Sequence, residues 1–165
     1  MKTKRFVLLG FLMAIGIVLQ LLESFVPVVV VVPGFKIGLA NIVSLFALMV
    51  YGNKEMWIVG IGRIFIASLL QGTLFSIPFW LSLTGGLFAM FAMGVAQKIS
   101  IFSIYGISIL GSSFHVLGQV IAITYIYSQY FMQIFLPILL ALSIVSGLFI
   151  ALLTNKLIHL MKGRI

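Results

Sequence analysis

The sequence has no cysteine and no aspartate, and its only acidic residues are Glu23 and Glu55. Without cysteine the chain has no disulfide bonds, no thiolate catalysis and no cysteine-based metal site. Its two histidines, His115 and His159, lie far apart in the sequence, and His159 is close to the C-terminal end. We therefore expect neither a metal ion nor another cofactor.

Charged residues are also scarce, at 7% of the chain, whereas 63% of the residues are hydrophobic. A soluble domain would carry about a quarter of its residues as charged ones, so the composition indicates an integral membrane protein. A helix crosses the hydrocarbon core with about 20 mainly apolar residues. Six such segments fill the chain and predict one all-α domain over residues 1–165: 6–26, 37–52, 56–72, 75–97, 103–127 and 132–160.

Lysine and arginine residues fall almost entirely on one side of this predicted bundle. They precede the first span, occupy the turns after the second and fourth spans, and follow the sixth, whereas the opposite side has Lys36 alone. The positive-inside rule then places both termini in the cytoplasm of a bacterial cell. The net charge of +8 is explained by this topology and by attraction to anionic lipid in the bilayer, so we expect no nucleic-acid partner.

Arg63 is the most unusual residue in the predicted spans. It lies nine residues after Lys54, which corresponds to about 13 Å of helix in a hydrocarbon core about 30 Å thick. An arginine at that depth costs roughly 2.5–3.5 kcal/mol on insertion scales, so its side chain should face a cavity or a partner. Two interpretations remain: Arg63 binds a ligand, or it serves packing by capping carbonyl groups or pairing with Glu23.

Three further ionisable or polar residues lie around the connection between the first two spans. Lys36 is expected at the outer boundary of the membrane, with Asn41 about 7.5 Å further in. Glu23 ends the first span on the face that carries Gly16 and Gln20, at helical spacings of three and four. Glu23 is therefore either exposed to external water or part of a site.

The later spans add polar residues at helical spacing. Ser112, His115 and Gln119 form one stripe, in which His115 is either an interhelical hydrogen-bonding group or a ligand-binding one. The polar residues gather in the outer halves of their spans and predict an outward-facing pocket for a small anionic molecule, beside which Phe75, Phe79 and Trp80 offer stacking surfaces. The candidate ligand-binding residues are Glu23, Lys36, Asn41, Arg63, Ser82, His115 and Gln119.

Gly10 and Ala14 form a pair of small residues four positions apart in the first span. Small residues at this spacing let helices approach closely in a bilayer. The pair therefore serves either packing within the bundle or docking to another membrane subunit.

Three features together resemble a known family: the segment Pro33-Gly34-Phe35-Lys36-Ile37-Gly38-Leu39-Ala40-Asn41, Arg63, and Ser82-Leu83-Thr84-Gly85-Gly86. The chain resembles the Gx transporter family, also called heptaprenyl diphosphate synthase component I, which is similar to the substrate-binding S components of energy-coupling factor (ECF) transporters. The resemblance implies a six-helix bundle that captures a vitamin-like or flavin-like anion from outside. It also implies partners, a transmembrane coupling subunit and two ATPase subunits, with Gly10 and Ala14 in the place of the docking motif.

The synthase name implies a chemistry that this sequence does not support. Prenyl diphosphate synthases bind magnesium diphosphate through clustered aspartates, since a hard divalent cation needs several oxygen ligands, and this chain has no aspartate. It also lacks a phosphate-binding loop of the GxxxxGK[ST] type, so we expect no enzyme activity. Two alternatives to uptake remain: a membrane accessory in polyprenyl diphosphate or quinone metabolism, and a proton-coupled carrier that uses Glu23 and His115.

Overall fold

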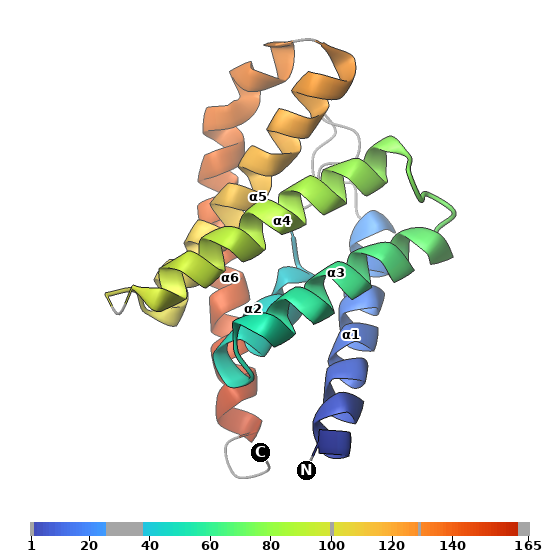
Figure 1. Cartoon of the computed structure of the whole chain (residues 1–165). Coiled ribbons are helices and arrows are strands. Elements are labelled where there is room, and N and C mark those ends of the chain that lie inside the picture. Colours follow the sequence, from blue (N-terminus) through green and yellow to red (C-terminus); the bar gives the residue numbers. More distant parts are fainter. Residues whose placement is uncertain (1, 26–37, 100, 129, 162–165) are drawn as a thin grey trace.

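A computed structural model describes residues 2–25, 38–99, 101–128 and 130–161 of the chain. Every regular element in these residues is helical, as the sequence predicts, and each of the six predicted segments overlaps one α-helix (Figure 1). The elements are α1 (Lys2–Phe25), α2 (Asn41–Val50), α3 (Asn53–Leu70), α4 (Ile77–Lys98), α5 (Ile104–Tyr127), the 3-10 helix η1 (Tyr130–Phe135) and α6 (Leu136–Met161).

Four stretches of helix in the described residues are long and apolar enough to cross a membrane: Arg5–Phe25, Ile77–Lys98, Ile104–Tyr127 and Gln133–Met161. The helix α2 has only 10 residues, about 15 Å of helix and half the hydrocarbon core. The helix α3 has 18 residues, but Lys54, Glu55 and Arg63 are among them. The structure therefore confirms a helical protein with four candidate membrane spans, and the six-span topology stays a prediction.

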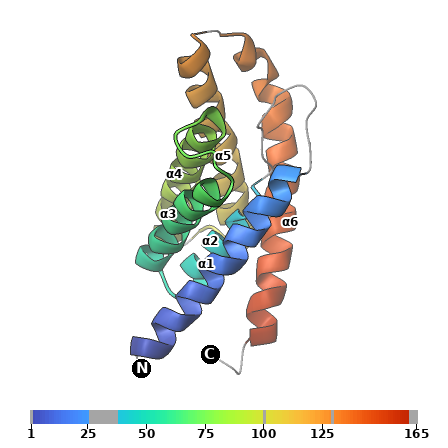
Figure 2. The same ribbon diagram turned by 90° about the vertical axis from the view of Figure 1, so that its right-hand side faces the viewer.

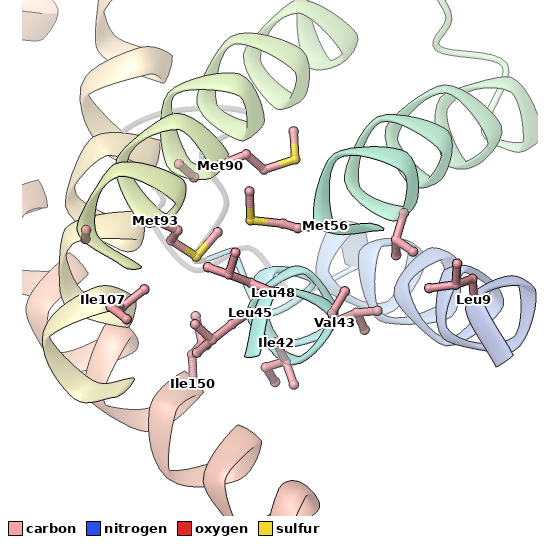
Figure 3. Packing of buried hydrophobic residues seen from close by; sticks show 14 residues of the cluster. Leu9, Ile42, Val43, Leu45, Leu48, Met56, Met90, Met93, Ile107 and Ile150 are labelled. Atoms are coloured by element: carbon pink, nitrogen blue, oxygen red, sulfur yellow. The ribbon is translucent and has the colours of Figure 1, made fainter. Parts of the chain in front are cut away.

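The short helix α2 occupies the centre of the molecule and packs against all five other α-helices. Its residues from Asn41 to Leu48 are all buried, which explains why the helix is apolar on every side. Leu45 and Leu48 contribute to a core to which α3 and α4 add Met56, Met90 and Met93 (Figure 3). Methionine suits this position because its flexible side chain fills irregular spaces between helices.

Contacts at both ends of α1 set the directions of α2 and α3. Near the start of α1, the Arg5 guanidinium donates to the Tyr51 carbonyl at 3.1 Å and to Glu55 at 2.7 Å, so the turn between α2 and α3 lies there. Near the end of α1, Gln71 donates to the Ser24 hydroxyl at 2.8 Å. The helix α3 therefore runs from one end of α1 to the other.

The start of α1 and the end of α6 lie at the same end of the molecule in both views (Figures 1 and 2). The turn between α2 and α3 lies beside that end, because it is bonded to Arg5. This arrangement agrees with a topology in which both termini are on one side of the membrane.

Candidate functional site

The Arg63 side chain is buried, with 4% of its surface exposed, and it lies between α1 and α2. Nη1 donates to the Gln20 side-chain oxygen at 3.0 Å, and Nη2 donates to the Asn41 side-chain oxygen at 3.1 Å. The Arg63 stem passes over Gly16, where a Cβ atom would lie 2.9 Å from Arg63 Cδ. Glycine at position 16 thus makes room for an arginine from α3.

Glu23 lies one helical turn beyond Gln20 and is also buried, with 4% of its surface exposed. Its carboxylate accepts hydrogen bonds from the backbone N–H groups of Gly38 and, at 3.3 Å, Leu39. These groups precede α2, so Glu23 fixes the start of α2 against the end of α1. Its negative charge also acts on Arg63 electrostatically. Glu23 is therefore buried near Gln20 and Arg63 and does not face external water.

Asn41 and His115 meet at the backbone of Gly38. A Cβ atom on Gly38 would lie 2.8 Å from Asn41 Nδ2 and 3.8 Å from His115 Cδ2. The φ angle of Gly38 is +86°, a conformation in which glycine is favoured because it has no Cβ atom. Gly38 therefore lets α2 and α5 bring their polar side chains together.

Gln119 and His115 meet α4 at Gly85. A Cβ atom on Gly85 would lie 3.0 Å from Gln119 Cγ and 3.0 Å from His115 Cε1. Both polar side chains are buried. The imidazole thus lies between Gly38 and Gly85 and continues the polar cluster from Arg63 toward Gln119. We call the set Gln20, Glu23, Asn41, Arg63, His115 and Gln119 the Arg63 cluster.

Two predicted ligand-binding residues, Ser82 and Lys36, are not members of the Arg63 cluster. Ser82 is buried, and its hydroxyl donates to the Pro78 carbonyl within α4 at 2.9 Å. Ser82 lies one turn from Gly85 on the same helix and is therefore near the cluster. Its bond to Pro78 is made within α4. Lys36 falls outside the described residues.

Gln20 is the residue of this cluster that the predicted set of ligand-binding residues omits. It is 2% exposed and bonds directly to Arg63. The signal in the sequence was its spacing of three from Glu23 on the face that also carries Gly16. A glutamine facing the same way as a buried acid in a membrane helix is itself a candidate for a polar site.

The predicted aromatic stacking surface is largely occupied by aromatic residues of the protein. Phe79 is 1% exposed, and its ring packs edge-on against Phe65, Phe75 and Trp80 with centroids 5.3, 5.5 and 5.4 Å away. Such edge-to-face pairs stabilise the contact between helices. Phe79 is therefore a packing residue between α3 and α4, whereas Phe75 and Trp80 keep exposed surface.

Several polar atoms of the Arg63 cluster have no hydrogen-bond partner among the described residues. They are Arg63 Nε, Gln20 Nε2, Asn41 Nδ2 and both polar atoms of the Gln119 amide. Buried polar atoms are nearly always hydrogen-bonded in native proteins. These atoms are therefore the positions at which a ligand would add bonds.

The helices and this cluster define a class: an all-helical protein with membrane-length helices and a buried polar cluster between them. The family model for heptaprenyl diphosphate synthase component I matches residues 12–157. The chain belongs to that family, as the motifs of its sequence predict. Neither a curated protein nor a solved structure matches the chain.

Proposed function

We propose that this protein is the substrate-binding subunit of an ECF-type uptake system and binds a small anionic solute at the Arg63 cluster. The observation that carries the proposal is a group of donors next to Arg63 that have no hydrogen-bond partner among the described residues: Arg63 Nε, Gln20 Nε2 and Asn41 Nδ2. A carboxylate, a phosphate or a ring carbonyl supplies the acceptor atoms that these donors lack.

Elementary chemistry explains why the free groups are donors. A guanidinium has five N–H donors and no acceptor, so Gln20 and Asn41 must turn their carbonyl oxygens toward Arg63. Their NH2 groups then point away from it. The Glu23 carboxylate accepts hydrogen bonds from the backbone of the segment before α2. The free atoms next to Arg63 are therefore donors, whereas Gln119 offers both a donor and an acceptor.

The position of the cluster along α1 supports access from outside the cell. Gln20 lies 18 residues after the start of α1, about 27 Å along the helix and far from the end at which α1 begins. With cytoplasmic termini and six crossings, the cluster lies in the outer half of the membrane. The contacts at both ends of α1 support six crossings, since α3 extends along the whole of α1.

Energy for uptake would come from partners, a transmembrane coupling subunit and two ATPase subunits. Gly10 and Ala14 are exposed on α1, and a Cβ atom on Gly10 would have no neighbour within 4 Å. The small pair therefore does not serve packing within the described bundle. An open face of small residues suits close contact with a helix of another subunit.

The test of the site is native mass spectrometry of protein purified from its own membranes in mild detergent. We expect a co-purifying small anion on the wild-type protein, its loss in Arg63→Gln, and its retention in the control Lys98→Gln, whose side chain is exposed at the end of α4. Size-exclusion chromatography checks that each variant is folded. An anion that stays bound to folded Arg63→Gln, or no anion on the wild type, would contradict the proposal.

A second candidate function, a non-catalytic membrane accessory in polyprenyl diphosphate or quinone metabolism, is favoured by the description of the matching family. A catalytic role is disfavoured by the positions of the two acids: Glu55 bonds Arg5 near the start of α1, whereas Glu23 is near its end. Two carboxylates so far apart do not share a magnesium ion. Co-purification of a soluble prenyl synthase instead of ATPase subunits would support this candidate.

A further inference from the structure

A groove of about 430 Å³ lies between α1 and α6, on a face of the molecule separate from the Arg63 cluster. Both helices pack against α2, and no contact between α1 and α6 occurs in the described residues. Figure 2 shows α2 behind and between them. The helix α2 therefore forms the floor of the groove, and α1 and α6 form its walls.

The lining is apolar except for one residue. Ile42, Val43 and Phe46 of α2 form the buried floor. The lining residues of the walls are Leu12, Ile15, Leu19, Leu153, Lys156, Leu157, Leu160 and Met161. An apolar groove that opens sideways between two membrane-length helices faces the acyl chains of the bilayer, and its volume is in the range of small-molecule sites.

The charged residue of the groove lining is Lys156. It is exposed and lies in the second-last turn of α6, at the end of the molecule where α1 begins. The sequence adds Lys2, Lys4 and Arg5 at the start of α1. A lysine beside an apolar surface extends its ammonium group toward the lipid headgroups.

We infer that this groove binds one acyl chain of an anionic phospholipid from the leaflet at the terminal end, with Lys156 beside the phosphate. A membrane helix of a partner fits less well, because a helix is about 10 Å across and would leave Lys156 against apolar side chains. A phospholipid supplies both the chain that fills the groove and the negative charge that Lys156 needs.

The groove and the Arg63 cluster use different faces of α1. Leu12, Ile15 and Leu19 line the groove, whereas Gly16 and Gln20 contact Arg63. The inference therefore does not depend on the proposed solute site. A variant of the groove that loses lipid and keeps the solute, or the reverse, separates the two.

The experiment places the purified protein in nanodiscs that contain equal amounts of phosphatidylglycerol and phosphatidylcholine, and counts the lipids retained after detergent exchange by native mass spectrometry. We expect one phosphatidylglycerol on the wild type and about fivefold weaker retention in Lys156→Gln, the size expected for one lysine near an anionic headgroup. Leu157→Trp fills the groove and should also release the lipid. The control Lys98→Gln removes an exposed lysine outside the groove and should retain the lipid.

The pattern of lipid retention in the variants tests the inference. Selective loss of phosphatidylglycerol in both groove variants, with retention in Lys98→Gln, supports the inference. Equal retention in all variants, or retention of phosphatidylcholine equal to that of phosphatidylglycerol, overturns it. Displacement of phosphatidylglycerol by a low concentration of added geranylgeranyl diphosphate would replace the phospholipid with a prenyl diphosphate as occupant and favour the second candidate function.

Discussion

Single residues decide how a positive charge is accommodated in this apolar protein. Arg63 is bonded to two neutral side-chain amides and interacts electrostatically with Glu23. Glu23 in turn bonds the backbone that precedes α2. The arginine and the glutamate are thus both buried with polar partners, which is the condition for tolerating ionisable groups at membrane depth.

Replacement of Glu23 tests this arrangement. Glu23→Ala leaves the N–H groups of Gly38 and Leu39 without their acceptor, and each unsatisfied buried donor costs about 1–3 kcal/mol. Glu23→Gln keeps a carbonyl oxygen at the same place and should destabilise the protein less. Thermal unfolding in detergent measures the difference, and equal melting temperatures for Glu23→Ala and the wild type would contradict the assigned role.

At the scale of helices, close packing depends on glycines at the crossing points. Gly118 of α5 faces α4, where a Cβ atom would lie 2.7 Å from the Thr84 carbonyl oxygen and 3.0 Å from Gly85 Cα. Gly147 of α6 faces α5, where a Cβ atom would lie 2.8 Å from Ile109 Cα. The nearby Ser108 hydroxyl donates to the Gly147 carbonyl at 2.7 Å. Backbone atoms cannot rotate out of the way as a side chain can, so these helices are held at glycine-to-backbone distance.

Gly118→Ala should therefore separate α4 from α5. We expect a loss of about 1–3 kcal/mol, the usual cost of overpacking, seen as a lower melting temperature and weaker retention of any ligand, because His115 and Gln119 lie on the same helix. Gly10→Ala is the matched control, since a Cβ atom at Gly10 meets nothing within 4 Å and alanine favours the helix. Similar melting temperatures for the two variants would refute this account of the α4–α5 contact.

The outward face of α1 carries the docking prediction. Gly10→Leu and Ala14→Leu should reduce co-purification with the coupling subunit and the ATPase subunits, because leucine keeps a partner helix from approaching the small pair. Their effect on folding should be slight, since both positions are exposed. Ala141→Leu, on an exposed position of α6, is the matched control. A complex that persists in both α1 variants would locate the docking surface elsewhere.

For the whole molecule, topology is the property that decides from which side the Arg63 cluster is reached. The chain has no cysteine, so a single introduced cysteine reports its own position. In intact cells, a membrane-impermeant maleimide should label Thr73→Cys and Tyr130→Cys. Lys54→Cys and Lys98→Cys should react only after permeabilisation. External labelling of both Lys54→Cys and Thr73→Cys, which lie at opposite ends of α3, would show that α3 does not cross the membrane.

Much of the fold could be read from the sequence because its signals are local. Length and hydropathy predict the helices, and each helix satisfies its own backbone groups, which lipid does not. At α2, predicted as a span over residues 37–52, the same reasoning does not settle whether the helix crosses the membrane. The helix has 10 residues and is apolar because other helices surround it, and hydropathy does not distinguish a buried helix from one that faces lipid.

The candidate site was likewise only partly predictable from the sequence. Arg63, Glu23 and His115 could be recognised as unusual from the sequence, since ionisable groups at membrane depth are costly and therefore rare. The packing of the helices shows what the sequence could not: Gln20 and Asn41 bond Arg63, Glu23 faces Gly38, and Phe79 is enclosed by other rings. Those contacts join helices that are distant in sequence, and they depend on which glycines let the backbones approach, a property of paired surfaces that no single segment contains.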